Sequence, residues 1–425
     1  MANTYLSRTN SSSGTSDKIF TYSFWIKRAK VDAEHCIAGA GTSQREFIRF
    51  ESTGELTYRR TSGSAFQFTT LRKFRDVGAW YNIVFNIDSR LSSGGDRVKL
   101  YVNGVSETAV SAATDMGQNY TPKIGAAELQ TIGKDSEQAN PYFDGCMSHV
   151  HFIDGIRYDA SYFGSTDSTT GEWKINTSPS VTYGTNGFTI LKDGNTITDQ
   201  SSNSNNFTLS GGTLTNTEDC PDNNFATMNP LFAGDANITY SNGNLKTTAT
   251  NASQKNAVST IGVSSGKWYC EMVSRNGTNY PGFGIMDSQS VLQTSVSYLG
   301  SSSDSYCMFQ DGNYYTNGSA SSTGTTWGVG SIMGVAIDLD SSTKTIKFYK
   351  NGSQTHSATI ATPANAYVFA VSHNTDGTIT EINFGNGYFG TTAVSSAGTN
   401  ASGIGIFEYD VPSGYTALST KGLNI

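Results

Sequence analysis

A strand–turn–strand pattern occurs twice in this chain, and the two copies lie roughly a domain length apart. In the first copy an apolar run over residues 79–88 is followed by an alternating run over 97–104. In the second copy residues 332–340 and 344–352 repeat this order. Each copy closes on an Asn-Gly pair, which favours a tight turn at the end of a strand. The repetition predicts two antiparallel β-sandwich domains in tandem.

Length and composition agree with this prediction. The chain has 425 residues, which is too long for one ordinary sandwich and suits two domains. Aromatic residues make up 12% of the chain and charged residues only 15%, a balance typical of an all-β protein with many turns. Residues 19–28 alternate in the manner of a half-buried strand, and no helical periodicity extends beyond about two turns. We therefore expect an all-β fold.

The composition changes in the middle of the chain, where polar runs cover residues 199–208 and 219–224. Such a change between two complete sandwich patterns indicates a domain junction. The sequence predicts a first domain over residues 1–185, a linker packed on the domains over 186–235, and a second domain over 236–425.

The first predicted domain resembles the concanavalin A-like (laminin-G-like, pentraxin-like) jelly roll. The resemblance rests on short motifs in the family order: Phe-Trp-Ile-Lys at 24–27, Trp-Tyr at 80–81 with Asp88, Lys-Leu-Tyr-Val-Asn-Gly at 99–104, Ile-Gly at 132–133 and Phe-Asp-Gly at 143–145. It implies a binding domain, a glycoside hydrolase of the laminarinase type, or a domain that holds Ca²⁺.

The second predicted domain resembles the SPRY (B30.2-like) sandwich. The matching motifs are Gly-Lys-Trp-Tyr-Cys-Glu at 266–271, Gly-Phe-Gly at 282–284, the second copy of the repeated pattern at 334–352, and Asn-Phe-Gly at 383–385. This resemblance implies binding of proteins or peptides through loops at one end of the sandwich.

Two further segments are similar to structural proteins of tailed bacteriophages. Residues 219–230 resemble the usual linker of those proteins, and residues 409–418 resemble their usual ending. This similarity implies a tail-fibre or surface-appendage subunit at the virion surface, made in the host cytoplasm, that contacts other virion proteins and a host-surface glycan or protein. It also implies a homo-oligomer, with a trimer as the first expectation. The alternatives are a capsid or tail decoration protein without a ligand and, least favoured, a laminarinase-type hydrolase.

Charge and apolar patterning exclude other classes of partner. The formal net charge is −7 and the chain holds no Lys/Arg run, so we expect no nucleic-acid partner. No window reaches a membrane-spanning length, and no apolar stretch follows the first residues, so we expect neither membrane insertion nor a signal peptide. The five cysteines have no zinc spacing, which indicates reduced and mostly buried thiols; they are Cys36, Cys146, Cys220, Cys270 and Cys307.

The pattern of acids and histidines argues against an enzyme. Glycoside hydrolysis needs two carboxylates about 5–5.5 Å apart for retention, which on one strand would read as closely spaced acids. The strand acids here stand alone; they are Asp144, Asp154, Glu271 and Glu381. His149 and His151 share a strand face and suit either a metal pair or a structural role, which we favour because no third ligand is evident.

A calcium ion in the first domain is the one cofactor that the sequence leaves open. Asp88, Asp96, Asp144 and Asp154 have the ligand type that Ca²⁺ prefers. The alternative, which we favour, is that Asp88 and Asp144 stabilise turns.

Aromatic residues in polar loops of the second domain are the best binding candidates, because aromatic faces beside amides suit sugar stacking or protein contact. They are Tyr280, Tyr298, Tyr306, Tyr315 and Trp327. Their loops are rich in Gly and Ser, which predicts exposure. Tyr314 and Tyr315 must point to opposite faces of a strand, so we expect at most one of them to be available.

Overall fold

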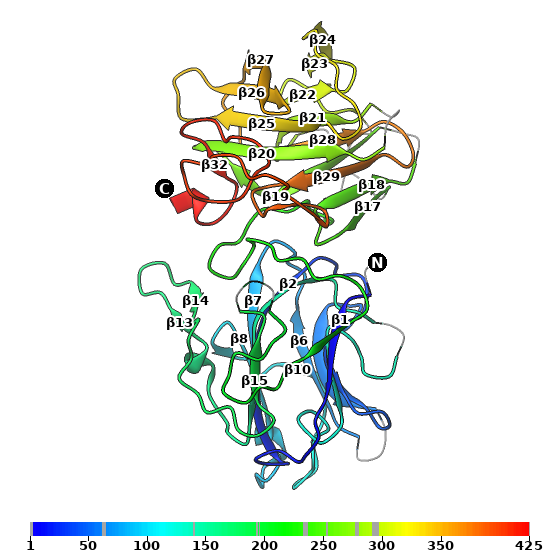
Figure 1. Ribbon diagram of the computed structural model, residues 1–425, viewed down its shortest axis with the longest axis vertical. Coiled ribbons are helices and arrows are strands. Elements are labelled where there is room, and N and C mark those ends of the chain that lie inside the picture. Colours follow the sequence, from blue (N-terminus) through cyan, green and yellow to red (C-terminus); the bar gives the residue numbers. More distant parts are fainter. Residues whose placement is uncertain are drawn as a thin grey trace. The chain divides into compact units, whose positions relative to one another are not determined.

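The computed structural model describes residues 3–61, 65–138, 141–192, 194, 196–232, 237–251, 254–276, 280–290 and 297–424. The chain divides into two compact units, Met1–Asn216 (unit 1) and Thr217–Ile425 (unit 2). Each unit is an antiparallel β-sandwich (Figure 1). In the described residues the helical elements are three-residue 3-10 turns. The all-β prediction is confirmed.

Unit 1 packs an eight-stranded sheet, in the order β10-β6-β5-β4-β3-β11-β1-β16, against a six-stranded sheet, in the order β15-β12-β2-β7-β8-β9. Its strands are β1 (Tyr5–Thr9), β2 (Ile19–Arg28), β3 (His35–Ala40), β4 (Glu46–Phe50), β5 (Glu55–Arg60), β6 (Gln67–Lys73), β7 (Trp80–Asp88), β8 (Val98–Val102), β9 (Val105–Ser106), β10 (Val110–Thr114), β11 (Leu129–Ile132), β12 (Gly145–Asp154), β15 (Phe188–Ile190) and β16 (Thr208–Ser210), with a separate hairpin of β13 (Gly164–Thr166) and β14 (Trp173–Ile175).

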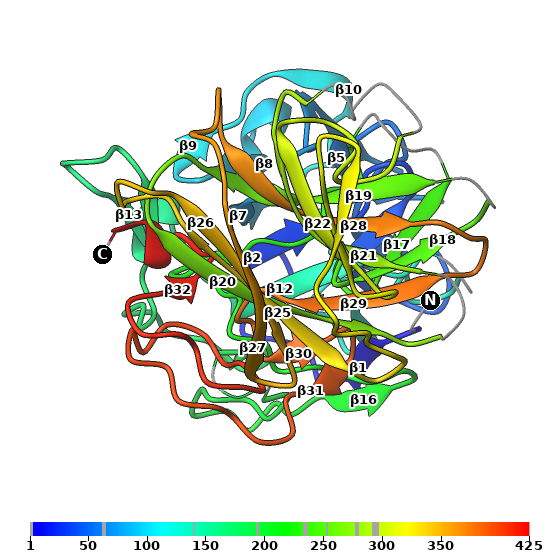
Figure 2. The same ribbon diagram turned by 90° about the horizontal axis from the view of Figure 1, so that it is seen from above.

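Unit 2 packs a sheet in the order β17-β18-β29-β20-β25-β26-β27 against a six-stranded sheet in the order β19-β28-β21-β22-β23-β24 (Figure 2). Its strands are β17 (Ile238–Ser241), β18 (Lys246–Ala249), β19 (Lys255–Val263), β20 (Lys267–Ser274), β21 (Gly282–Asp287), β22 (Ser305–Phe309), β23 (Asn313–Thr316), β24 (Ser319–Ser322), β25 (Ile332–Asp338), β26 (Thr345–Lys350), β27 (Ser353–Thr359), β28 (Tyr367–His373), β29 (Ile379–Asn383), β30 (Tyr388–Phe389), β31 (Thr392–Ala393) and β32 (Thr416–Ala417), the last of which pairs with β20 in parallel.

The repeated sequence pattern folds as the antiparallel pairs β7–β8 and β25–β26. The Asn-Gly pair that closes each copy turns the chain into the next strand, β9 or β27. Asn103 and Gly104 have φ of 48° and 77°, and Asn351 and Gly352 have φ of 47° and 80°. Both residues of each pair therefore adopt the left-handed conformation that two-residue hairpin turns require.

Strand β2 is buried on both faces, so the expectation of a half-buried strand is wrong. The alternate residues Phe20, Tyr22 and Phe24 enter the core between the sheets. The opposite face of the sheet is covered by the segment that follows β12. There Thr21 Oγ1 donates to the Ile156 carbonyl (2.9 Å), and Trp173 Nε1 donates to Asn82 Oδ1 of β7 (3.1 Å). A third layer without long strands thus occupies the outer face of this sheet.

Aromatic rings make up much of the core of unit 1. The Tyr22 ring meets Phe24 edge to face with 5.4 Å between ring centroids, and it meets Phe152 of β12 at the same separation. Such aromatic pairs add to the stability that burial alone provides.

A covering layer also lies on the outer face of the β20–β25 sheet of unit 2. There Phe225, Phe407, Val411 and Tyr415 pack on Tyr269. The Phe225 segment and the C-terminal segment are also hydrogen-bonded to each other, because Ala226 N donates to the Leu418 carbonyl (2.9 Å). The two segments that resemble phage proteins, 219–230 and 409–418, therefore form one packed layer.

The segment predicted as a linker, 186–235, divides between the two units. Strands β15 and β16 extend the two sheets of unit 1. Phe225 and Met228 instead form bridges with Ser419 and Ser259 of unit 2. Apolar residues on both sides of the polar runs explain this division, because each side is buried in a different unit.

We expect limited proteolysis to cut the chain first within residues 211–218, because this segment joins the units without belonging to a strand. Fragments 1–216 and 217–425 should each unfold cooperatively when expressed alone. Mass spectrometry of the fragments and thermal unfolding of each one check this. First cuts within β7–β8 or β25–β26, or a fragment without a cooperative transition, would contradict it.

Candidate functional site

Several loops of unit 2 meet at one end of the sandwich, and we call them the end loops: residues 274–276, 280–281, 310–312 and 323–331. Backbone hydrogen bonds join them. Gln310 N donates to the Pro281 carbonyl (3.1 Å), Trp327 N donates to the Gln310 carbonyl (3.2 Å), and Gly330 N donates to the Ser274 carbonyl (3.0 Å). The end loops thus form one connected surface.

Tyr280 is the most exposed of the predicted binding residues, with 52% of its surface accessible. Its φ of 44° is left-handed, which is uncommon for a bulky residue. Val329 in a neighbouring end loop is 53% exposed. The end loops therefore present apolar side chains to solvent, as a contact surface requires.

The expectation that Trp327 and Tyr306 are exposed is wrong. Trp327 is 3% exposed and Tyr306 5%, and both belong to the core between the sheets. Trp327 Nε1 donates to the Phe309 carbonyl (3.0 Å), so the indole is buried with its polar group satisfied. The polar loop around Trp327 folds back over the end of the core, and this closure is what buries the ring.

Tyr298 and Tyr315 are half-buried on the outer face of the β21–β22 sheet. Their rings meet edge to face with 5.6 Å between centroids, and both also contact Phe309. Tyr314 lies in the core, so the prediction that Tyr314 and Tyr315 occupy opposite faces is confirmed. Sequence reasoning did not find Val329, because a single valine among glycines carries no periodic signal.

The four aspartates considered for calcium lie in separate settings. Asp88 accepts two hydrogen bonds from the Arg90 guanidinium (3.0 Å each), and Asp96 pairs with Lys99 (2.7 Å). Asp144 lies 3.9 Å from Lys30. The Arg90 hydrogen bonds are the main reason why the pKa of Asp88 is lowered. Within the described ranges, no group of three or more His, Cys, Asp or Glu side chains is placed to hold a metal ion.

Asp154 instead organises a rim of unit 1. Its carboxylate accepts hydrogen bonds from the backbone N–H groups of Thr15 (2.6 Å), Ser16 (3.2 Å) and Asn186 (2.9 Å). Gly14 lies against the same carboxylate, where a Cβ would stand 2.5 Å from Oδ1. This aspartate fixes a loop in place.

A pocket opens beside this loop, and we call it the rim pocket. It has a volume of about 140 Å³ and lies between the loop of residues 13–18 and the segment 121–127, over Ile19, Phe20 and Phe152. Sequence reasoning missed it, because its walls come from segments that are more than 100 residues apart and share no motif.

The histidine pair of β12 is buried, and we see a structural role for it. His151 Nδ1 lies 2.9 Å from the Tyr183 hydroxyl, and His149 Nδ1 lies 2.7 Å from Ser148 Oγ. Burial lowers the pKa of His151 to about 3, with a smaller contribution from His149. A neutral His151 packed under the covering layer of unit 1 acts as part of the interior.

The two fully buried strand carboxylates are held by protein donors. Glu46 in unit 1 accepts from the hydroxyls of Tyr58 (3.1 Å) and Tyr120. Glu271 in unit 2 accepts from the N–H groups of Glu408 (2.9 Å) and Tyr409 (3.0 Å), and burial raises its pKa to about 7. Neither side chain has any exposed surface. They are part of the interior and cannot reach a substrate bound outside.

The thiols are mostly buried. Cys36, Cys270 and Cys307 are buried, and Cys146 and Cys220 are partly buried. All five lie within the described ranges, where none of them forms a disulfide. Burial raises the pKa of each of three thiols, Cys36, Cys270 and Cys307, well above the usual range of a cysteine. These thiols are therefore unreactive.

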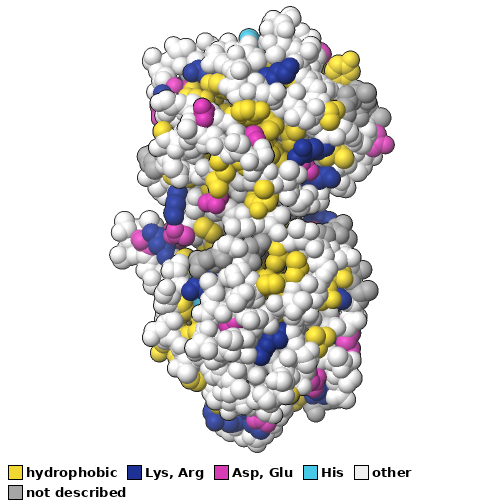
Figure 3. Space-filling model, viewed as in Figure 1, with side chains coloured by type: hydrophobic (Ala, Val, Ile, Leu, Met, Phe, Trp, Pro, Cys, Tyr) yellow, Lys and Arg dark blue, Asp and Glu magenta, His cyan; other side chains and the backbone are white. Residues whose placement is uncertain are grey.

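Charged side chains are few and scattered on the face of the molecule that Figure 3 shows. A weakly charged surface suits uncharged ligands better than phosphates. No helix in the described part of the chain is both long enough and apolar enough to cross a membrane.

Comparison with protein families assigns both sandwiches. Residues 2–161 match the concanavalin A-like lectin/glucanases superfamily, and residues 246–387 match the SPRY domain. The chain thus carries a concanavalin A-like domain and a SPRY domain in tandem. Domains of these two types typically bind ligands and do not catalyse, which suggests a binding role. The layers over the outer sheet faces lie largely outside the matched residues.

Similar solved structures include the SPRY domain of human HERC1, at 18% identity over 36% of this chain and 96% of that chain, with a TM-score of 0.31. The TRIM65 PSpry domain is 14% identical over 37% of this chain and 91% of that chain, with a TM-score of 0.29. Stonustoxin is 15% identical over 58% of this chain and 34% of that chain, with a TM-score of 0.29. The search of curated proteins found no significant match.

Proposed function

We propose that this chain is a non-enzymatic surface protein of a tailed-bacteriophage virion, a tail-fibre or appendage subunit that binds a glycan or protein of the host surface. One observation carries the proposal: the segments 219–230 and 409–418, which resemble phage structural proteins, form a single packed layer on the SPRY domain. Because both segments belong to one structural element, together they support a common origin with phage structural proteins better than either segment does alone.

In this proposal the end loops of unit 2 form the surface that binds the partner. The outer faces of two sheets, one in each unit, are covered in part by the chain's own segments, which leaves less open surface there. The end loops of unit 2 keep exposed apolar side chains, with Tyr280 as the main anchor. Aromatic anchors of this kind supply much of the energy of protein interfaces.

Two alternatives remain distinct from this proposal. A decoration protein would occupy the virion without binding host cells. A laminarinase-type enzyme would need two accessible carboxylates about 5–5.5 Å apart. The strand carboxylates Glu46 and Glu271 lie in different units, and each is buried and held by backbone or tyrosine donors, so neither suits that role. We further propose a homo-oligomer on the particle, with a trimer as the first expectation, because appendages of symmetric particles are usually symmetric themselves.

Immunogold electron microscopy of purified phage particles that encode this chain tests the proposal. Antibody against the chain should label tail fibres or other surface appendages. Absence of the chain from purified particles, checked by mass spectrometry, would overturn the virion role. Label confined to the capsid, on particles whose host binding the antibody does not block, would favour the decoration protein.

Replacement of Tyr280 by alanine should weaken binding to cells of the propagating host by roughly 2 kcal/mol, or about 30-fold, because the ring is exposed at the end loops. Stability should change little, since an exposed ring contributes little to the core. Binding of the fluorescently labelled protein to cells gives the affinity. The matched control is Tyr162→Ala, which removes a tyrosine of unit 1 that is 40% exposed. Equal losses in both variants would contradict the role of the end loops.

A further inference from the structure

Seven Asn-Gly pairs occur in the chain, and this dipeptide has a chemistry of its own. The glycine has no Cβ to hinder its backbone nitrogen, so that nitrogen can attack the Cγ atom of the preceding asparagine. The attack forms a C–N bond and expels ammonia, which leaves a five-membered succinimide ring. Water then opens the ring at one of its two carbonyl carbons and yields aspartate or isoaspartate. The reaction consumes one water and releases one ammonia, and it needs no enzyme.

Hydrogen bonds decide how fast this reaction proceeds in a folded protein. The asparagine side chain must turn toward the next peptide group, and the glycine N–H must be without a partner when its nitrogen attacks. A hydrogen bond to either group has to break first, which raises the barrier. The seven pairs can therefore be ranked by the partners of their asparagine side chains and glycine N–H groups.

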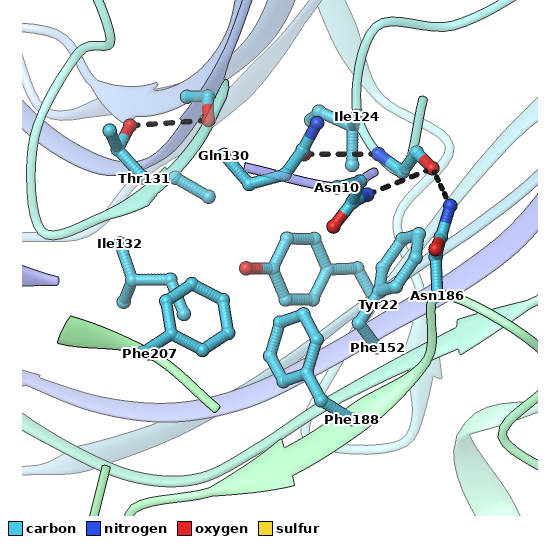
Figure 4. A pocket seen from close by; sticks show the side chains of 13 residues that line it. Asn10, Tyr22, Ile124, Gln130, Thr131, Ile132, Phe152, Asn186, Phe188 and Phe207 are labelled. Atoms are coloured by element: carbon cyan, nitrogen blue, oxygen red, sulfur yellow. Dashed lines mark hydrogen bonds between the residues drawn. The ribbon is translucent and has the colours of Figure 1, made fainter. Parts of the chain in front are cut away.

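In four pairs the asparagine side chain is held by hydrogen bonds. These asparagines are Asn103, Asn186, Asn276 and Asn351. In the two turns that close the repeated pattern, the side-chain oxygens of Asn103 and Asn351 accept a backbone N–H of the neighbouring strand, at 2.8 Å and 2.9 Å. Asn186 Nδ2 donates to the Gly125 carbonyl (2.9 Å), as Figure 4 shows. None of these side chains can reach the next peptide group without losing a hydrogen bond.

In two further pairs the glycine N–H is held. Gly318 N donates to the Gly300 carbonyl (3.0 Å), and Gly387 N donates to Asn383 Oδ1 (3.2 Å). Asn386, which precedes Gly387, is in addition only 2% exposed. The attacking nitrogen of both pairs is therefore occupied.

The seventh pair, Asn242-Gly243, lies in the turn between β17 and β18. In the part of the chain that the structure describes, neither the Asn242 side chain nor the Gly243 N–H has a hydrogen-bond partner. The bond across this turn runs from Leu245 N to the Asn242 carbonyl (3.3 Å) and involves neither reacting group. Gly243 also lies in open space, because a Cβ there would meet nothing within 4 Å. The two reacting groups can approach each other without the loss of a hydrogen bond.

We propose that Asn242 is a site of spontaneous deamidation, with water as the only co-reactant, and that the fold protects the other six pairs. The reaction replaces a neutral amide by a carboxylate. Asn242 Nδ2 and Glu381 Oε1 both lie against Gly390, where a Cβ would stand 3.0 Å and 2.7 Å from them. The new carboxylate therefore lies beside that of Glu381, and like charges at short range repel each other. The modification acts on the hairpin at the edge of the β20–β25 sheet.

Peptide mass spectrometry of the full-length protein tests this after incubation in mildly alkaline buffer, which favours deprotonation of the attacking nitrogen. Loss of the amide at Asn242 should be about fivefold or more faster than at any other Asn-Gly pair, the factor that one hydrogen bond of ordinary strength provides. Isoaspartate should be among the products, which electron-transfer fragmentation identifies. Asn242→Gln should stay unmodified, because the longer side chain would have to close a six-membered ring. Asn317→Gln is the matched control and should leave the rate at Asn242 unchanged.

The same incubation in urea separates the effect of the fold from that of the sequence. Unfolding removes the hydrogen bonds of all seven pairs, so their rates should converge. A rate at Asn242 no higher than that of the other pairs in the folded protein would overturn the proposal. An equal preference for Asn242 in urea would also overturn it, because the flanking residues and not the fold would then select this site.

Discussion

Replacement of Trp327 by alanine is expected to lower the free energy of unfolding of unit 2 by about 3–5 kcal/mol. The indole is 3% exposed and packs in the core between the two sheets, so its removal leaves a cavity. It also removes the donor to the Phe309 carbonyl. Denaturant unfolding of the full-length protein, followed by pulse proteolysis to resolve the two units, measures the effect.

Two controls separate packing from binding at this position. Trp327→Phe keeps part of the ring volume and should cost less than Trp327→Ala, while the transition of unit 1 should not move in either variant. Affinity for host cells per folded molecule should stay unchanged, unlike in Tyr280→Ala. Unchanged stability with reduced binding would show that Trp327 is a surface anchor and not a core residue.

Mild acid should destabilise unit 1 between about pH 7.5 and pH 5. Burial lowers the pKa of His35 to about 4 and of His151 to about 3. Both bind a proton more weakly in the folded state than in the unfolded chain, where the pKa is about 6.5. The contribution of each neutral histidine to the free energy of unfolding is therefore complete above about pH 6.5. It falls as the pH drops toward the folded pKa, and by pH 5 the loss is about 2 kcal/mol for each histidine.

Unit 2 should respond less, because it contains opposing groups. Burial lowers the pKa of His373 to about 4, and this histidine loses stability on acidification as those of unit 1 do. Burial raises the pKa of Glu271 to about 7, so its contribution is present below about pH 4.5 and is lost as the pH rises through 7. Between about pH 7.5 and pH 5, the changes in the free energy of unfolding due to His373 and to Glu271 have similar size and opposite sign. In unit 1 the pKa of Glu46 is also raised, so this residue stabilises the unit on acidification. Its effect there opposes the losses from two histidines rather than from one.

Urea unfolding with pulse proteolysis at several pH values checks this difference between the units. His373→Gln removes the loss that His373 causes in unit 2 and leaves only that of the half-buried His356, whose pKa burial also lowers. Unit 2 should then become more stable on acidification while unit 1 behaves as in the parent. Equal acid sensitivity of the two units in the parent protein would contradict the assignment of neutral, buried histidines.

The sequence predicts the hairpins well and the end loops of unit 2 poorly, and both results have physical reasons. Alternation around a polar turn specifies β7–β8 and β25–β26 locally, and the Asn-Gly pairs specify the tight turns that follow into β9 and β27, so short-range information was enough. The burial of Trp327 depends on hydrogen bonds to Gln310 and Phe309, which the composition of its own loop does not reveal. The layers over the outer sheet faces have no periodic pattern, so nothing in the sequence indicates which face they cover.

Each unit joins its first and last segments, and this has a consequence for synthesis on the ribosome. Strand β1 pairs with β16 in unit 1, and Ala226 is hydrogen-bonded to Leu418 in unit 2. Translation proceeds from the N-terminus, so the last contacts of each sandwich become available only when nearly the whole unit has emerged. Unit 1 can close while unit 2 is still being made, whereas a nascent chain that stops near residue 400 leaves Phe225 and Tyr269 uncovered. A chain truncated within the last twenty or so residues of unit 2 would therefore be an aggregation-prone intermediate with exposed apolar surface, and not a shorter but fully folded domain.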